Sequence, residues 1–359
     1  MDLALYDPEA GYYARAPRRS GRAGDFFTSV DVGPLFGRLL EAQVAEMAGL
    51  LHPEEPAASG PFDLVEAGAG DGRLSADLLD AARTHNPSLY ARTRLHLVEA
   101  SAAARASHRR TLGASADRLA YSGAALPAGF EGVLVANELL DAFPVHQVVM
   151  RGGALREVYV DADFRIGEGA PSTPALGAYL RRLGIVLDEG WRAEINLSAV
   201  EWILQAAQRL ARGFLVLIDY GHEARRLYSA AHAAGTLTSF TRHTAALGDP
   251  SATSRDRPAW AHRPGEQDIT AHVDFTSVRA AAESAGLTTI ALLDQTYFLL
   301  GIVRALDAEG DRGALVPSPR ALKTLIMPGG LGSTMKVLVM GKGVGRPALR
   351  GVSFAARMT

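Results

Sequence analysis

Residues 62–79 read FDLVEAGAGDGRLSADLL, and this stretch decides the fold of the chain. Its first six residues are a short, mostly apolar run, which predicts a β-strand. Three glycines at alternate positions follow, and they predict a tight turn because glycine adopts backbone conformations closed to other residues. These glycines are Gly68, Gly70 and Gly72. Apolar residues then recur on one side of a helix over 74–82. The stretch predicts a strand, a turn and a helix in direct succession.

Similar units recur along the chain. We expect further strands over 94–99, 132–136 and 214–218, the last of which stops at Asp219. Helices are expected from Ser101 and over about 198–210. Short apolar strands that alternate with helices indicate a parallel sheet with both faces covered. The predicted fold is therefore α/β and Rossmann-like, with a mostly parallel sheet.

One segment departs from this alternation. The stretch Val145–Val160, with Gly152 and Gly153 at its centre, predicts an antiparallel hairpin. We expect an inserted α+β subdomain here, with an exposed apolar face that could support a homodimer. The expected divisions are a lid or cap segment at 1–60, a core at 61–144 and 191–345, the insertion at 145–190, and a flexible tail at 346–359.

Composition excludes several classes of protein. The 359 residues include 37 basic and 39 acidic side chains, so the formal net charge of −2 provides no global field for holding nucleic acid. There is no cysteine, which excludes disulfides, thiol nucleophiles and Cys-ligated metals. No apolar run approaches the roughly 20 residues that span a bilayer. Because Asp2, Asp7 and Glu9 stand where an export signal would be basic and then apolar, we expect a cytoplasmic protein.

The glycine turn indicates a nucleoside ligand. A dinucleotide site has the spacing G-x-G-x-x-G, whereas here the third glycine comes one residue early and follows Asp71, which would repel a phosphate. Glu99, at the end of the next strand, could accept both hydroxyls of a ribose. The sulfonium cofactor S-adenosylmethionine suits these groups, since its positive charges tolerate Glu66 and Asp71. A purely structural turn and an NAD site remain alternatives.

Several segments resemble the MidA family of methyltransferases, whose mitochondrial members are complex I assembly factors. They run in the family's order over nearly the whole chain and include a specific Asn-Glu segment and a Gly-Glu-Gln-Asp-Ile-Thr segment. The resembling segments are DPEAGYY (7–13), GDFFTS (24–29), EAGAGDGRLSADLL (66–79), LVEAS (97–101), ANELLDAFPVHQ (136–147), IDYG (218–221), GTL (235–237) and PGEQDITAHVDFT (264–276). The chain departs from the family at Val30-Asp31, where the family has Pro-Glu.

The resemblance implies a class I S-adenosylmethionine-dependent methyltransferase with a seven-stranded sheet. It also implies a protein substrate, because the mitochondrial members methylate arginine in a complex I subunit and form symmetric dimethylarginine. Two other functions stay open, namely an assembly factor that binds the cofactor without catalysis and a small-molecule methyltransferase. An NAD-dependent oxidoreductase is a third alternative, against which Asp71 argues.

Residues after the strand at 132–136 are the candidates for catalysis. Methyl transfer is an in-line displacement that needs alignment of the reactants and no metal, so we expect no metal in the site. A guanidinium has five donors, and two convergent carboxylates, Glu138 and Asp141, would suit it. Asn137 could bind the cofactor or the substrate. The alternative is that Asn137 to Asp141 form a helix cap.

Further site residues are expected in two other segments. His272 could accept a proton late in the reaction, although a lone histidine is also a common structural residue, and it alternates with Asp274 along an extended segment. Gly24, Thr28 and Ser29 belong to a segment of small, aromatic and hydroxyl side chains that suits a lid over the sulfonium. The full set of expected cofactor contacts is Gly24, Thr28, Ser29, Glu66, Gly68, Gly70, Gly72, Glu99 and Asn137.

Overall fold

The computed structural model describes residues 1–15, 28–51, 60–241, 244–245, 258–310, 316, 318–327 and 330–355. The chain divides into two compact units. The sheet unit comprises Thr28–Leu139, Leu204–Asp219 and Ala282–Thr359. The hairpin unit comprises Met1–Phe27, Leu140–Ile203 and Tyr220–Ala281. Among the helices that the structure describes, none is long and apolar enough to cross a membrane.

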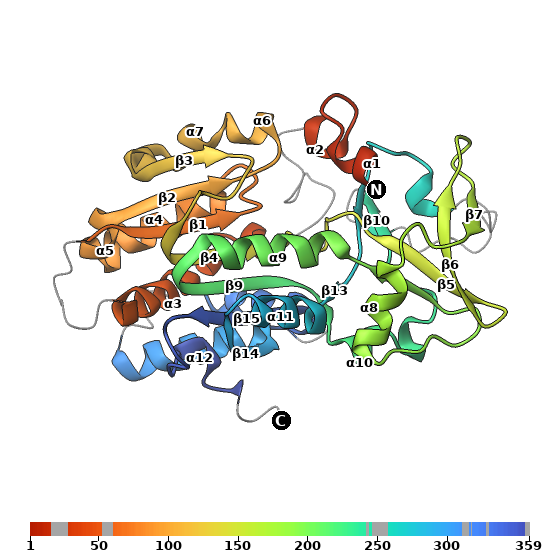
Figure 1. Ribbon diagram of the computed structural model, residues 1–359. Coiled ribbons are helices and arrows are strands. Elements are labelled where there is room, and N and C mark those ends of the chain that lie inside the picture. Colours follow the sequence, from red (N-terminus) through yellow and green to blue (C-terminus); the bar gives the residue numbers. More distant parts are fainter. Residues whose placement is uncertain are drawn as a thin grey trace. The chain divides into compact units, whose positions relative to one another are not determined.

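The sheet unit is built on a mostly parallel sheet. Its strands follow the order β14-β15-β9-β4-β1-β2-β3, and Figure 1 shows β3, β2, β1, β4 and β9 side by side. Neighbouring pairs from β9 to β3 are parallel, whereas β14 and β15 are antiparallel. The strands are β1 (Phe62–Ala67), β2 (Thr93–Val98), β3 (Leu119–Gly123), β4 (Phe130–Asn137), β9 (Leu210–His222), β14 (Thr288–Asp294) and β15 (Met335–Lys342). The predicted Rossmann-like α/β fold is confirmed.

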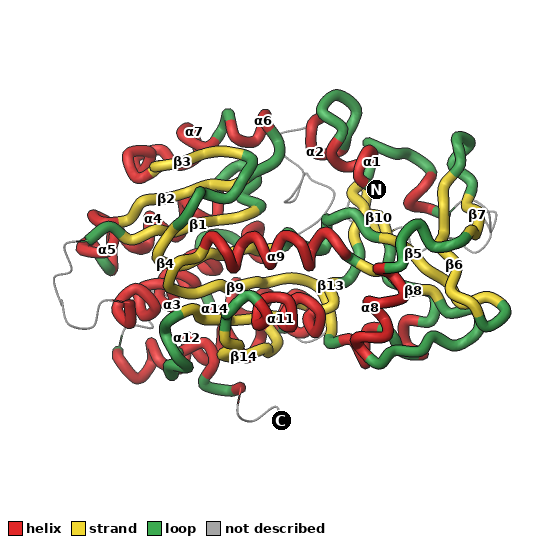
Figure 2. Tube along the Cα trace, viewed as in Figure 1, coloured by secondary structure: helices red, strands yellow, loops and turns green. Residues whose placement is uncertain are grey.

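Helices connect these strands, as Figure 2 shows. The strand β1 is buried along its whole length, as expected where helices cover both faces of a parallel sheet. The helical elements are η1 (Ser29–Val32), α3 (Leu35–Leu51), α4 (Arg73–His85), α5 (Pro87–Arg92), α6 (Ala102–Arg105), α7 (His108–Leu112), η2 (Gly113–Arg118), α9 (Leu197–Arg209), α11 (Phe275–Ser284), α12 (Gln295–Glu309), α14 (Pro319–Ile326), α15 (Leu331–Thr334) and η5 (Arg350–Val352). Of these, α9 and α11 run from one unit into the other.

The hairpin unit contains a four-stranded sheet in the order β7-β6-β5-β8 and a small three-stranded sheet in the order β11-β10-β12. The predicted hairpin is confirmed, since β5 and β6 pair antiparallel. The elements are α1 (Asp2–Tyr6), α2 (Tyr12–Arg15), β5 (His146–Arg151), β6 (Ala154–Val160), β7 (Ile166–Gly169), α8 (Ala175–Leu183), β8 (Arg192–Ile195), α10 (Ala224–Leu227), η3 (Ala230–His232), β10 (Thr238–Thr241), β11 (Thr244–Ala245), η4 (Ala259–Ala261), β12 (Asp268–Thr270) and β13 (Val273–Asp274). A cluster of buried residues around Tyr179 and Ile195 packs α8 against the four-stranded sheet.

Three details differ from the expectations. The strand expected to stop at Asp219 continues to His222, because Gly221 and His222 pair with β13 and keep their backbone groups bonded. The sheet of the expected insertion also includes β8, which lies beyond residue 190. Within the expected tail, the amide of Gly351 donates to Gln43 at 2.7 Å, so η5 is held against α3.

Candidate functional site

The turn after β1 has the geometry that its glycines predict. Gly68, Gly70 and Gly72 have φ angles of +73°, +53° and +89°, a region that side chains rarely adopt. The amides of Gly68 and Ala69 both donate to the carbonyl of Val98, which holds the turn against β2. A Cβ at Gly70 would meet no atom within 4 Å among the described residues. The backbone at Gly70 therefore faces open space that a ligand can approach.

Glu99 lies directly beside this turn. Its Oε2 accepts a hydrogen bond from the amide of Gly70 at 2.8 Å, and its Oε1 accepts one from the amide of Ser101 at 2.7 Å. Burial raises the pKa of this carboxyl, and the two backbone donors oppose the rise. A carboxylate has about four acceptor positions, so two remain for the hydroxyls of a ribose.

Glu66 has a different environment from Glu99. Its carboxylate is buried and accepts from both the amide and the hydroxyl of Ser75, in the first turn of α4. Burial raises the pKa of Glu66 to about 8. These bonds connect the end of β1 to the start of α4, so Glu66 stabilises the turn between them.

Asn137 ends β4, the strand that pairs with β1, and Glu138 directly follows it. The amide of Glu138 donates to the carbonyl of Ile218 at 2.8 Å, and the Asn137 Nδ2 donates to the Glu138 Oε1 at 3.1 Å. Glu138 has a φ angle of +54°, which is uncommon for a residue with a side chain. The next amide, that of Leu139, donates to the buried carboxylate of Asp219 at 3.1 Å. Residues 138–145 form bends and turns without a helix, so the helix-cap alternative is wrong.

Residues 137–139, called the elbow below, lie against the glycine turn. A Cβ at Gly68 would stand 3.0 Å from the Cδ1 atom of Leu139, so the two segments are in contact distance of one another. The Oδ1 atom of Asn137 is buried and has no hydrogen-bond partner within the described part of the chain. A buried acceptor without a partner requires explanation, and a bound ligand that donates a hydrogen bond would supply one.

The expected lid residues lie partly within the described chain. Gly24 falls outside the described residues. Thr28 and Ser29 are buried, and they begin η1. Thr28 bonds through its amide and hydroxyl to Asp31, while Ser29 donates to Gln295 at 3.1 Å. Asp31 in turn pairs with Arg73 at 2.9 Å, which places η1 beside the start of α4.

Asp141 and His272 belong to the hairpin unit. Asp141 is buried and accepts from the Thr270 hydroxyl at 2.8 Å, and its carbonyl accepts from the amide of Ala271. Asp141 therefore lies beside the segment that carries His272. Burial and the neighbouring His232 lower the pKa of His272 to about 4.

The structure separates His272 from Asp274. Asp274 accepts from the Tyr179 hydroxyl at 2.7 Å and from the amides and hydroxyl at the start of α11. It therefore caps that helix, and the alternation along the chain does not produce a His-Asp pair.

Comparison with known proteins decides the family. The family described as "Putative S-adenosyl-L-methionine-dependent methyltransferase" matches residues 39–293. The chain belongs to this methyltransferase family. The mitochondrial protein arginine methyltransferase NDUFAF7 of Mus musculus is 29% identical over 88% of this chain and 73% of its own length. The homologue of that protein in Drosophila melanogaster is 30% identical over 80% of this chain and 66% of its own length.

A solved structure extends the likeness to the whole methyltransferase chain. A protein from Burkholderia thailandensis, crystallised with S-adenosyl-homocysteine, is 31% identical and has a TM-score of 0.81 over 99% of this chain and 89% of its own. A second solved structure, of a protein from the same organism, has a TM-score of 0.77 at 32% identity over 99% of this chain and 88% of its own. S-adenosylmethionine is accordingly the cofactor of this methyltransferase, which has the expected class I fold.

The residues of the sheet unit fit that cofactor. The open backbone face at Gly70 leaves room for a ligand, and Glu99 keeps acceptor positions for hydroxyls. The Oδ1 of Asn137 can accept a further hydrogen bond from the ligand. Acidic groups around the turn are compatible with a cationic ligand and unfavourable for a phosphate.

Sequence reasoning missed two residues of this site in the methyltransferase. His108 is buried between Gly70 and Ser122, with its Nε2 2.9 Å from the carbonyl of Gly70. Asp31 pairs with Arg73 across 42 positions of the chain. Neither has a sequence signal, because each acts through a partner far away along the chain.

Proposed function

We propose that this methyltransferase transfers the methyl group of S-adenosylmethionine to an arginine in a protein substrate. Its relatives in Drosophila melanogaster and Mus musculus, at about 30% identity, are named protein arginine methyltransferases, which supports arginine as the acceptor. The resemblance to the MidA family adds symmetric dimethylarginine as the product and a complex I subunit as the candidate substrate. A cytoplasmic location is part of the same proposal, and cell fractionation would test it.

The observation that carries the proposal is the conformation of Glu138. A half-buried carboxylate sits at the carboxyl end of β4, beside the glycine turn, in a backbone conformation with φ of +54°. Such a conformation costs on the order of 1 kcal/mol or more and persists where the surroundings enforce it. Here the Ile218 carbonyl and the Asp219 carboxylate hold the flanking amides. The backbone of Glu138 thus leaves the extended conformation of β4, which changes the direction in which its side chain projects.

The proposed cofactor contacts follow from the same region. Gly68, Gly70 and Gly72 form the surface on which the nucleoside rests, and Glu99 accepts its ribose hydroxyls. Asn137 accepts a hydrogen bond through its Oδ1. The remaining proposed contacts are Gly24, Thr28, Ser29 and Glu66, the last of which also bonds to Ser75 at the start of α4.

The proposed chemistry needs few groups from the protein. The cofactor supplies an electrophilic methyl group when bound. Glu138 accepts hydrogen bonds from N–H groups of the guanidinium. These bonds orient one nitrogen for in-line attack, and the negative carboxylate stabilises the positive charge of the guanidinium. The attacking nitrogen loses a proton after methylation, and a carboxylate within reach can hold it. Asp141 and His272 remain proposed participants in binding the guanidinium and accepting the proton.

The variant Glu138→Gln tests this role. It keeps an oxygen for the bond from Asn137 and removes the charge, so we expect turnover to fall by about 100-fold or more while cofactor affinity is unchanged. Glu131→Gln is the matched control, since Glu131 lies near the other end of the same strand and is exposed. Methylation of arginine-containing proteins would be followed by mass spectrometry, with an Arg→Lys substrate as the negative control.

The outcomes separate the alternatives. Equal turnover of wild type and Glu138→Gln would remove Glu138 from the mechanism. Cofactor binding without transfer to any protein or small amine would favour the non-catalytic assembly factor. Methylation of amines or small guanidines alone would overturn the protein substrate.

A further inference from the structure

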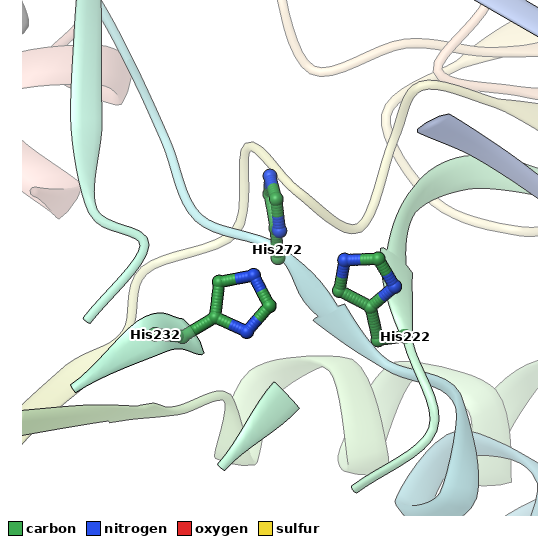
Figure 3. Close-up of side chains that lie close together, drawn as sticks. All are labelled: His222, His232 and His272. Carbon is green, nitrogen blue, oxygen red and sulfur yellow. The ribbon is translucent and has the colours of Figure 1, made fainter. Parts of the chain in front are cut away.

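Three histidines of the hairpin unit lie together outside the glycine turn. His222 ends β9, His232 ends η3, and His272 stands between β12 and β13. Each offers a ring nitrogen, and these nitrogens all lie within 4.8 Å of one another. Figure 3 shows the three side chains converging from separate segments of the ribbon. The chain thus brings together three imidazoles that are 10 or more positions apart in sequence.

We propose that His222, His232 and His272 bind a divalent transition-metal ion, with Zn²⁺ as the best fit. Imidazole nitrogens are common ligands of Zn²⁺, and three of them leave a fourth position for water or another ligand. Zn–N bonds of about 2.0–2.1 Å at tetrahedral angles place two nitrogens roughly 3.4 Å apart. Small rotations of the half-buried rings would close the observed spacing to that value.

The ring of His232 is already oriented for ligation. Its Nδ1 lies 3.0 Å from the carbonyl of Arg226, and a carbonyl accepts, so Nδ1 carries the proton. The lone pair is therefore on Nε2, the other ring nitrogen. Metal-binding histidines regularly donate their second nitrogen to a backbone carbonyl in this way.

The position of His272 adds an independent observation. Its Nδ1 is buried and has no hydrogen-bond partner among the described residues. The ring stands 5.4 Å from that of His222 and 5.9 Å from that of His232, measured between centroids. A metal ion at the centre of the cluster would give the buried ring of His272 a partner and would explain why three imidazoles pack together here.

The backbone around the cluster is fixed by a buried carboxylate. Glu194 accepts from the amide and hydroxyl of Thr236, and that hydroxyl in turn accepts from the amide of His272 at 3.1 Å. His222 is held from the other side, since it pairs with Asp274 in the β9–β13 ladder. The three ligands therefore come from a supported framework, which lowers the entropy lost on binding.

Metal binding would give His272 a role as a ligand. A metal-bound imidazole has no lone pair for a proton at the ligating nitrogen, so metal binding would replace the proton-accepting role proposed above. The ion would link the end of β9, η3 and the segment before β13. Its effect would be to stabilise the hairpin unit.

Titration of the full chain with ZnCl₂ after removal of metal by a chelator tests the site. We expect one equivalent to bind in calorimetry and to raise the melting temperature, and CoCl₂ to give visible absorption bands. His232→Gln and His272→Gln should each weaken binding by 10- to 100-fold or more, since changing a residue that only hydrogen-bonds to a metal ligand already has an effect of that size. His85→Gln, an exposed position at the end of α4, is the matched control and should bind as wild type does.

Affinity for S-adenosyl-homocysteine in each variant verifies that it is folded. Unchanged Zn²⁺ affinity in both folded histidine variants would overturn the inference, as would the absence of stoichiometric binding in the wild type. Because the readout is metal affinity, failure here would leave the proposed methyl transfer standing.

Discussion

At the scale of single residues, similar side chains near the glycine turn have different environments. Glu66 and Glu99 are both expected to contact the cofactor, and Glu66 accepts from Ser75 in α4 whereas Glu99 accepts from Gly70 within the turn. The difference comes from their places in the sheet, because Glu66 lies in β1 before the turn and Glu99 directly follows the neighbouring strand, β2. The glycines themselves are required by their backbone angles.

The variant Gly70→Ala should weaken S-adenosyl-homocysteine binding by about tenfold or more, which corresponds to about 1.4 kcal/mol. The added methyl group enters open space beside the turn, where we expect the ligand to lie. Gly113→Ala is the matched control, since its φ of +52° equals that of Gly70 within a degree and its Cβ also meets nothing in the described chain. Both variants should lose about 1–2 kcal/mol of stability. Calorimetric affinities that are equal in the two variants would refute the site.

At the scale of elements, polar contacts join one helix or strand to another. The Glu66–Ser75 pair connects β1 to α4, and the Asp31–Arg73 pair connects η1 to the same helix. The amides of Arg350 and Gly351 donate to Glu46 and Gln43, which hold η5 against α3. Each of these contacts makes one element dependent on another.

The Glu66 contact predicts a dependence of stability on pH. The folded pKa of about 8 lies above the unfolded value of 4.5, so folding favours the protonated form and stability falls as pH rises between these values. One group contributes at most about 1.4 kcal/mol per pH unit. Glu41 and Asp77, with pKa values raised to about 7 and about 6, act in the same direction.

Urea unfolding at pH 5.5, 6.5 and 7.5 can isolate the part that belongs to Glu66. Glu66→Gln keeps an acceptor for Ser75 and removes the ionisation, so we expect its stability relative to wild type to rise with pH. A constant difference between the two proteins across this range would show that Glu66 does not titrate there.

The position of η5 predicts the effect of Gly351→Ala. A Cβ at Gly351 would stand 2.4 Å from Phe298 and 2.9 Å from the Oε1 of Gln43, so we expect a loss of about 1–3 kcal/mol from overpacking. Gly49→Ala in α3 is the control, because its Cβ meets nothing within 4 Å in the described chain and alanine favours a helix by about 1 kcal/mol. Chemical denaturation should therefore show a lower free energy of unfolding for Gly351→Ala and a higher one for Gly49→Ala than for the wild type. Wild-type stability of Gly351→Ala would mean that the end of the chain is loosely held.

At the scale of the whole molecule, the chain passes repeatedly between two compact units. The sheet unit's first segment ends at Leu139 and the chain re-enters the hairpin unit at Leu140, while β9, α9 and α11 each span both units. The cofactor turn and Glu138 belong to the sheet unit, whereas the histidine cluster belongs to the hairpin unit. Binding of S-adenosyl-homocysteine should therefore stabilise the sheet unit first.

S-adenosyl-homocysteine at 100 times its Kd should stabilise the protein by about 2.7 kcal/mol, because it binds the folded state alone. NAD at the same concentration should have no effect, since acidic groups surround the turn. Thermal unfolding measures both, and hydrogen exchange should show slower exchange at residues 68–75. Stabilisation by NAD would restore the dinucleotide alternative.

The sequence by itself determined the alternation of strands and helices, the glycine turn and the family resemblance. These are local properties, carried by apolar periodicity and by residue types at fixed spacing, and they are read without knowing any distant contact. The nucleoside-binding chemistry could be inferred from Asp71 and Glu99 for the same reason. Only the tertiary structure decided that Glu66 bonds to Ser75, that Asp274 caps α11, and that β9 continues to His222. It also brought three histidines together and placed His108 under Gly70, because such contacts depend on strand pairing and packing between segments that sequence spacing leaves unspecified.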